Sequence, residues 1–286
     1  MRNLTEDNVT AAVVQKFAAS SDQRLVEIMT ALVTHLHAFV REVRLTEEEW
    51  VQAIQFLTQT GQMCDAIRQE FILLSDTLGM STLVDAINHR RGPNATENSL
   101  LGPFFREGAT KVEIGANIAK TPGEPAWIHG YIRSSSGKPI SGAEIEVWQT
   151  ASNGQYEGQD PNQPLSNLRA KLTTDANGYY AFRSIRPTSY PIPTDGPVGR
   201  MLQALGRHPY RPAHVHFIIS APGFDKLVTE LYDEVDPYLD SDAVLGVKNS
   251  LVIRFTRNES KADATKYGFS EPFFEAHYDF GLEERR

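Results

Sequence analysis

The hydrophobic pattern of the chain changes near Gly102, and this change constrains the fold more than any other feature. Before it, apolar residues recur at three- and four-residue spacing, as in "SDQRLVEIMTALVTHLHAFVREV", which predicts amphipathic helices. After it, short β-rich runs such as "AWIHGYI", "AEIEVWQT" and "AHVHFIIS" are separated by glycine and proline, which is typical of a β-sandwich. We therefore expect a mainly β protein with α, in which a helical domain of residues 1–101 precedes a β-sandwich domain of residues 102–286.

Local signals indicate where several of these elements begin and turn. Thr46 and Glu49 have the spacing of a capping box, which predicts a helix that starts after Thr46. Asn177 and Gly178 lie between two β-rich arms in "AKLTTDANGYYAFRSI", which predicts a β-hairpin. Two further helices are expected in "CDAIRQEFILLSDTLG" and "STLVDAINHRRG", each of which ends at a glycine.

Charge and cysteine content exclude several classes of protein. The chain carries a net charge of -8 with acidic and basic residues mixed along it, so it lacks the basic face that binds a nucleic-acid backbone. No apolar run approaches the roughly 20 residues of a membrane span, and the polar start "MRNLTEDN" is unlike a secretory signal. The single cysteine, Cys64, cannot form an intramolecular disulfide, so we expect a reducing, cytoplasmic location.

Two H-x-H pairs differ in whether they could hold a metal. His35 and His37 lie in an expected helix, where side chains two residues apart diverge by about 200° and do not easily share one ion. His214 and His216 lie in an expected strand, "RPAHVHF", where side chains two residues apart face the same side. The strand pair can therefore converge on one metal, although packed or surface histidines give the same pattern.

The usual zinc ligands that could complete such a site are scarce in this chain. The chain has one cysteine and no H-E-x-x-H motif. Instead, Tyr156 and Tyr190 lie in loops rich in glycine, proline and asparagine, where a tyrosine is either an aromatic plug or a ligand. A free phenol has a pKa of about 10, so only a strongly charged cation would deprotonate it. Two phenolates and two imidazoles suit ferric iron, but spacing alone leaves both interpretations open.

Several longer segments resemble the signature segments of intradiol ring-cleavage dioxygenases, which comprise catechol, chlorocatechol and hydroxyquinol 1,2-dioxygenases. These segments are "LLGPFFREGA", "DANGYYAFRSIRP", "YPIPTDGPVG", "GRHPYRPAHVHFIISAPGF" and "DAVLGVKNSLV". They follow the family's order, and the resemblance runs through nearly the whole chain. It implies that the β-sandwich is the catalytic domain, and that the N-terminal helices form a dimerisation domain that also supplies one wall of the pocket.

The resemblance also implies a non-haem Fe(III) centre with one ion per subunit. On the matching positions its ligands are Tyr156, Tyr190, His214 and His216. Tyr190 corresponds to the displaceable tyrosinate, which accepts a substrate proton. Arg211 corresponds to the active-site arginine, which would stabilise negative charge on the substrate; the alternative for Arg211 is a structural ion pair. The implied reaction inserts both atoms of O2 into an aromatic diol or triol, between neighbouring hydroxyl-bearing carbons.

The same resemblance places the walls of the substrate pocket. The implied substrate-binding residues are Leu73, Asp76, Thr77, Leu100, Leu101, Gly102, Arg211 and Val244. Asp76 is the informative residue, because an acid there would hydrogen-bond a third ring hydroxyl; the alternative is a helical aspartate at the solvent edge. Together with "NLTEDNVTAAVVQKFA" and "LTEEEW", it favours hydroxyquinol (benzene-1,2,4-triol), cleaved to 3-hydroxy-cis,cis-muconate, over catechol or a chlorocatechol.

Two positions depart from the family pattern. Phe105 stands where many relatives have a tyrosine, and Glu230 stands where catechol enzymes often have a glutamine beside the metal histidines. An acid at Glu230 would change the hydrogen bonding around those histidines.

The resemblance further implies a homodimer joined through the N-terminal helices, with a phospholipid bound at that junction. The apolar stripe of residues 25–39 is compatible with such a dimer and equally with packing on the chain's own sandwich. Two rival functions stay open: a non-catalytic β-sandwich binding module, and a zinc hydrolase that uses the same histidines.

Overall fold

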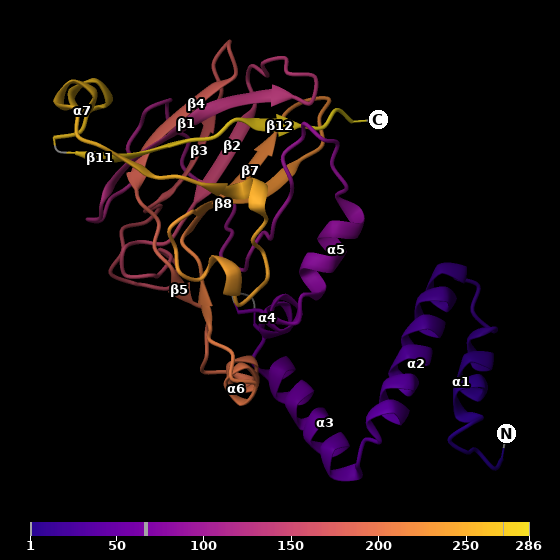
Figure 1. Ribbon diagram of the computed structural model, residues 1–286. Coiled ribbons are helices and arrows are strands. Elements are labelled where there is room, and N and C mark those ends of the chain that lie inside the picture. The colour runs from indigo at the N-terminus through magenta and orange to yellow at the C-terminus, as the bar shows by residue number, and fades with distance from the viewer. Residues whose placement is uncertain (1, 66–67, 271, 286) are drawn as a thin grey trace. The chain divides into compact units, whose positions relative to one another are not determined.

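The computed structural model describes most of the chain (Figure 1), namely residues 2–65, 68–270 and 272–285. The chain divides into two compact units, Met1–Gln62 and Met63–Arg286. This division falls earlier than the boundary that we expected near Gly102. The helices that follow residue 62 contact the β-sandwich, since Thr82 Oγ1, for example, donates to the carbonyl of Leu245 at 3.1 Å.

Three helices make up the first unit: α1 (Val9–Phe17), α2 (Gln23–Val43) and α3 (Glu47–Gln62). Helix α2 begins where Asp22 Oδ1 accepts the N–H of Leu25 at 2.9 Å, and it ends at Arg44, whose φ of 52° is left-handed. The predicted capping box is present before α3. Thr46 Oγ1 accepts the N–H of Glu49 at 3.2 Å, and Glu49 Oε2 accepts the N–H of Thr46 at 2.9 Å.

In the described residues of the second unit, two five-stranded sheets and one two-stranded sheet form the body. The first has the order β10-β11-β1-β12, with β4 also paired to β1. Its strands are β1 (Pro125–Ser134), β4 (Tyr179–Ile185), β10 (Thr256–Asn258), β11 (Phe273–His277) and β12 (Phe280–Leu282). The second, of order β3-β2-β7-β8-β9, contains β2 (Glu144–Trp148), β3 (Arg169–Thr173), β7 (His214–Ser220), β8 (Leu227–Asp233) and β9 (Val252–Ile253). The small sheet pairs β5 (Tyr190–Pro191) with β6 (Tyr210–Arg211).

The main hydrophobic core joins the two large sheets. Ile128 and Phe182 of the first sheet belong to one buried cluster with Val147, Phe217 and Leu231 of the second, and none of the five is more than 1% exposed. Burial of each such side chain stabilises the fold by about 1.5–3 kcal/mol. Both large sheets therefore contribute side chains to one core. The expected mainly β fold with α, built on a β-sandwich, is confirmed.

The expected hairpin at Asn177–Gly178 is wrong in its pairing. The turn itself is present, with Gly178 at a φ of 76° and its N–H donating to the carbonyl of Asp175 at 3.1 Å. However, β3 pairs with β2 in one sheet and β4 pairs with β1 in the other. The turn therefore carries the chain from one sheet to the other.

Helices surround the sandwich within the second unit. They are α4 (Glu70–Thr77), α5 (Met80–Asn88), α6 (Pro197–Ala204), α7 (Lys261–Tyr267) and the 3-10 turns η1 (Leu239–Ser241) and η2 (Asn249–Leu251). Figure 1 shows α6 and α7 at opposite ends of the sandwich, with α4 near α6. Among the described residues, no helix has both the length and the apolar content that crossing a bilayer requires.

Candidate metal centre

His214 and His216 lie on β7, the central strand of the second sheet, with β2 and β8 on either side. Neither residue is more than 2% exposed, and their Nε2 atoms lie 3.1 Å apart. Strand periodicity thus brings the pair together as predicted. His35 and His37 lie in α2, where His37 Nδ1 lies 3.0 Å from Thr10 Oγ1.

Backbone and burial set the protonation of the two imidazoles. His214 Nδ1 lies 2.7 Å from the carbonyl oxygen of Pro212, which can only accept, so Nδ1 carries the proton and Nε2 keeps its lone pair. Burial, together with the charge of Arg211, lowers the pKa of His214 to about 4. Burial also lowers the pKa of His216 well below its usual value. Both rings are therefore neutral near pH 7, as metal ligation requires.

Two tyrosines bring phenol oxygens to the same place. Tyr156 lies in the loop between β2 and β3, and Tyr190 begins β5, where it pairs with Arg211 of β6. Tyr156 Oη lies 3.0 Å from His216 Nε2 and 3.2 Å from Tyr190 Oη. The two phenol oxygens and the Nε2 atoms of His216 and His214 therefore form a series of four neighbouring atoms that could ligate a metal, and they come from three separate segments of the chain.

The chemistry of these four donors selects the kind of cation they could hold. Burial, and then the neighbouring Tyr190, raises the pKa of Tyr156 well above the usual value of a phenol. Burial also raises the pKa of Tyr190. The phenols therefore ionise only if a strongly charged Lewis acid takes the place of their protons. Hard phenolate oxygens with imidazole nitrogens fit ferric iron, and this donor set lacks the thiolates of most structural zinc sites.

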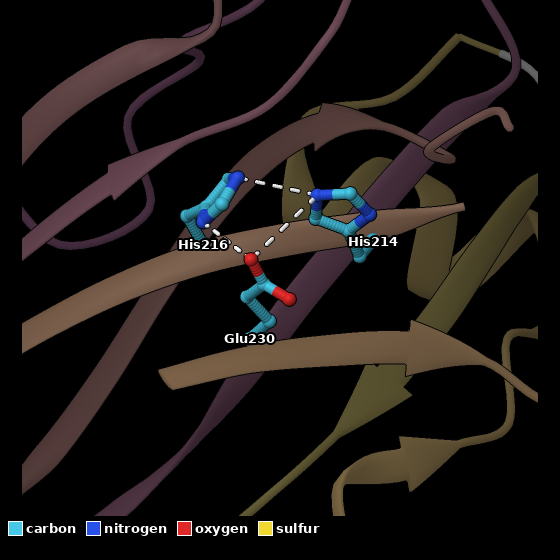
Figure 2. Close-up of side chains that lie close together, drawn as sticks. All are labelled: His214, His216 and Glu230. Atoms are coloured by element: carbon cyan, nitrogen blue, oxygen red, sulfur yellow. Dashed lines mark hydrogen bonds and ion pairs between the residues drawn. The ribbon is translucent and has the colours of Figure 1, made fainter. Parts of the chain in front are cut away.

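Glu230 is the carboxylate nearest to the two histidines. Figure 2 shows it below His214 and His216, and these three form the one His/Cys/Asp/Glu group of metal-binding size in the described part of the chain. Glu230 Oε1 lies 3.1 Å from His216 Nδ1, in an orientation that makes no hydrogen bond, and 4.0 Å from His214 Nε2. Glu230 thus approaches His216 on the side opposite Nε2, the atom that faces Tyr156.

Glu230 also belongs to a buried ionic network with Arg211. The guanidinium of Arg211 donates to both Glu230 oxygens, at 3.1 and 2.8 Å, and its Nε donates to Asp242 Oδ1 at 3.2 Å. Burial opposes both charges, yet the two acids keep the pKa of Arg211 raised, and Arg211 keeps the pKa of Glu230 lowered. The hydroxyls of Tyr232 and Ser99 complete the network as donors to Glu230.

A small cavity of about 20 Å³, the inner cavity, lies beside these donors. Its lining includes seven residues that the sequence singled out: Leu73, Asp76, Leu100, Gly102, Tyr190, Arg211 and Val244. Asp76 is 5% exposed, so it does not lie at a solvent edge, and burial raises its pKa. The sequence did not single out Pro103, Phe104, Ile192 and Pro193, which also line the inner cavity.

Two residues expected to line the pocket, Thr77 and Leu101, are not among those that line the inner cavity. Thr77 is buried, and its Oγ1 donates to the carbonyl of Leu74 within α4 at 3.1 Å. Leu101 is 42% exposed, and neither residue lines the inner cavity. Phe105, which departs from the family pattern, packs on Trp148 with ring centroids 5.2 Å apart.

Sequence reasoning did not find Tyr232 as a partner of Glu230, although strand alternation could have shown it. In the antiparallel pair of β7 and β8, Glu230 lies opposite His216 and Tyr232 lies opposite His214. Residues two apart on β8 therefore face the same side as the histidines.

Gly102 explains how the loop before the sandwich approaches the donors. Its φ is 70°, a left-handed conformation that favours glycine. A Cβ placed there would lie 3.2 Å from Cε1 of His216 and 3.6 Å from Nε2. The site therefore includes a position where a side chain would crowd a donor atom.

Comparison with known proteins places this geometry in a family. The chain matches the "Dioxygenase" family model over residues 100–284 and the "Catechol dioxygenase N terminus" model over residues 22–96. It is 47% identical to a hydroxyquinol 1,2-dioxygenase from a Rhizobium species, over 97% of this chain and 95% of the relative. It is 38% identical to catechol 1,2-dioxygenase of Candida albicans, over 96% of this chain and 91% of the relative. The crystal structure of hydroxyquinol 1,2-dioxygenase from Pseudomonas putida superposes with a TM-score of 0.93, at 51% identity, covering 98% of this chain and 99% of the other. The chain therefore belongs to the intradiol ring-cleavage dioxygenase family.

Proposed function

We propose that this dioxygenase cleaves hydroxyquinol with O2, between its two adjacent hydroxyl-bearing carbons, to 3-hydroxy-cis,cis-muconate, the enol form of maleylacetate. The observation that carries the proposal is the convergence of two phenol oxygens and two imidazole nitrogens beside a cavity that contains a buried carboxyl, Asp76. The higher identity to hydroxyquinol than to catechol enzymes supports this choice of substrate. The alternative is catechol or a chlorocatechol, which lacks the third hydroxyl.

The proposed cofactor is one Fe(III), held by Tyr156, Tyr190, His214 and His216. When bound, this ion supplies a Lewis acid and a template for the two neighbouring oxygens of the substrate. The chain itself keeps the imidazoles neutral through burial and fixes the tautomer of His214 through the carbonyl of Pro212. It also excludes water, since the four side chains are at most 3% exposed.

Tyr190 and Arg211 have separate roles in the proposed reaction. Tyr190 would hold the cation as a phenolate and would be the residue that accepts a proton from the diol, because burial raises the pKa of its phenol and so makes its phenolate a stronger base. The Arg211 guanidinium lines the inner cavity with its charge held in place by Glu230 and Asp242, so it faces the substrate in a fixed orientation.

The metal centre is tested by colour and metal content. Two tyrosinates on ferric iron give a visible charge-transfer band, so iron-loaded protein should be coloured and contain one iron per chain. Tyr190→Phe should shift or remove that band and reduce turnover. Tyr131→Phe is the matched control, because Tyr131 lies on β1 and contacts Tyr179, away from the donors. Colourless iron-loaded protein, or stoichiometric zinc with activity restored by zinc, would contradict the proposal.

The substrate is tested by O2 uptake and product identification with hydroxyquinol and catechol in parallel. A buried acid that hydrogen-bonds the third hydroxyl contributes about 1.5–3 kcal/mol, or about 10- to 150-fold. Asp76→Ala should therefore lower kcat/KM for hydroxyquinol by that factor and change it little for catechol. Asp76→Asn should lower kcat/KM for hydroxyquinol by a smaller factor, because its amide can still hydrogen-bond the hydroxyl. An equal loss on both substrates would assign Asp76 a structural role.

We also propose a homodimer through the first unit, with a phospholipid at the junction. Support comes from the apolar side chains that α2 leaves 47–53% exposed: Leu25, Ile28, Leu32, Leu36, Phe39 and Val43. Such a continuous apolar face is typical of an interface. Sedimentation equilibrium of the protein and of Leu32→Glu tests the dimer, and mass spectrometry of an organic extract tests the lipid. A monomer at micromolar concentration would refute the proposal.

A further inference from the structure

A second cavity, the outer cavity, adjoins the inner one and has a volume of about 360 Å³. The two cavities share four lining residues: Leu73, Pro103, Phe104 and Pro193. Tyr156 lines the outer cavity and Tyr190 lines the inner one, so the metal donors lie between the two. These shared walls make the outer cavity a natural route between the donors and solvent.

The lining of the outer cavity changes from buried to exposed. Glu70, Leu73, Tyr156 and Arg169 are buried and form its floor. The exposed residues Gln69, Arg106, Gly158 and Gln159 form its rim. A molecule that leaves Tyr156 through this cavity therefore passes Arg106 before it reaches water.

Three arginines line the outer cavity, but two already have acidic partners. Arg68 pairs with Glu70 at 2.9 Å and with Asp195 at 2.8 Å. Arg169 pairs with Glu157 at 3.2 Å, and both side chains are buried. Arg106 forms no ion pair or hydrogen bond within the described residues, so its guanidinium is the uncompensated charge of the cavity.

The Arg106 guanidinium lies over the backbone of Gly158. Its Nη2 is packed so closely over Gly158 that a Cβ on this glycine would lie 2.2 Å away. The glycine therefore leaves room for the guanidinium at the cavity wall.

The proposed reaction changes the charge of the bound molecule. Hydroxyquinol is uncharged near pH 7. Cleavage breaks one ring carbon–carbon bond, both atoms of O2 enter the product, and no further reductant is needed. The product has two carboxyl groups, which release two protons to solvent, so a neutral molecule enters and a dianion leaves.

We propose that the outer cavity is a binding site for the ring-opened dicarboxylate on its way out, with Arg106 as the group that binds a carboxylate. The inference rests on the proposed function for the identity of the anion. It assigns Arg106 to product binding rather than to the reaction, and it predicts that loss of the charge weakens binding of the product more than that of the uncharged substrate.

The test uses cis,cis-muconate as the probe, with its uncharged dimethyl ester as a second ligand, on iron-loaded protein. Calorimetry gives the Kd, and O2 uptake gives the inhibition constant. Arg106→Gln should raise both constants for muconate by about three- to tenfold, as expected for one partly exposed charge-assisted hydrogen bond. Arg106→Lys should recover part of the loss. Arg90→Gln is the matched control, because Arg90 is exposed and lines a different cavity.

The results for Arg106→Gln decide whether Arg106 binds the product. Equal constants in Arg106→Gln and Arg90→Gln, or an equal loss for the dimethyl ester, would overturn it, since neither result depends on a charge at Arg106. A band in the visible spectrum that matches wild type shows that the variant retains its metal centre. If wild type consumes no O2 with any diol, the proposed function fails, while calorimetry with muconate still decides whether Arg106 binds the anion.

Discussion

Replacing Glu230 by glutamine should destabilise the metal-free protein strongly. Both Glu230 and Arg211 have side chains that are at most 4% exposed, and they are joined by two contacts of 2.8 and 3.1 Å. Removing one partner of a buried ion pair costs about 3–5 kcal/mol, because the other charge stays buried. Arg211 retains Asp242 at 3.2 Å, and glutamine retains one oxygen, so we expect about 3 kcal/mol.

The assay is thermal unfolding of the metal-free protein, followed by circular dichroism. A loss of about 3 kcal/mol corresponds to a fall in Tm of about 6–12 °C for a unit of this size. Glu234→Gln is the matched control, because Glu234 and its partner Arg254 are 31% and 72% exposed. An exposed pair contributes about 0–1 kcal/mol. If Glu230→Gln lowers the Tm no more than Glu234→Gln, the ionic network does not stabilise the fold and the reasoning is refuted.

The pH dependence gives an independent check on the same residue. The charge of Arg211 lowers the pKa of Glu230 from its ordinary value of 4.5, against the opposing effect of burial. A carboxyl with a lowered pKa in the folded state stabilises the protein above its unfolded pKa and loses that contribution as pH falls through the folded value. The difference in unfolding free energy between wild type and Glu230→Gln should therefore be constant above about pH 5 and decrease below pH 4.5. A difference that grows on acidification would contradict this assignment.

Three further substitutions test other parts of the structure. Gly102→Ala forces a side chain into a left-handed φ and against His216, so it should cost at least about 1–2 kcal/mol and reduce the iron content of the purified protein. Arg169→Met should lower the unfolding free energy by about 3 kcal/mol, because it leaves a buried carboxylate unpaired; an unchanged Tm would show that water reaches this site. Thr46→Ala removes the capping box with Glu49 and should cost about 1 kcal/mol, measured as lost helical signal at intermediate denaturant. Glu49→Ala and the double variant Thr46→Ala/Glu49→Ala should show the same loss, whereas additive losses would show that the two side chains act separately.

The strand that carries the two proposed histidine ligands could be predicted from the sequence because its signal is local. A side-chain period of two places His214 and His216 on one face whatever the strand pairs with. The same reasoning applies to the capping box at Thr46, which depends on a spacing of three residues. Features that depend on a few neighbouring residues were therefore accessible without the fold.

Features that depend on pairing between distant segments were not accessible in the same way. The turn at Asn177–Gly178 was found, but its sequence does not specify that β3 and β4 join different sheets. The partners of Arg211 come from β8 and from Asp242, neither of which the motif around Arg211 contains. The placement of Thr77 away from the inner cavity depends on how α4 is rotated, which its weakly periodic sequence does not set.

The four proposed ligands lie on backbone segments that differ in local stability. Strand β7 is hydrogen-bonded on both sides, whereas Tyr156 lies in a loop and Tyr190 in a strand of two residues. Under mild denaturant the loop positions open at lower free energy than the interior of a sheet. The tyrosines should accordingly release a bound ion while the histidines are still in place. The visible colour would then fade at lower denaturant than the β-sheet signal, and the interval between the two would measure how far the centre can open without unfolding the sandwich.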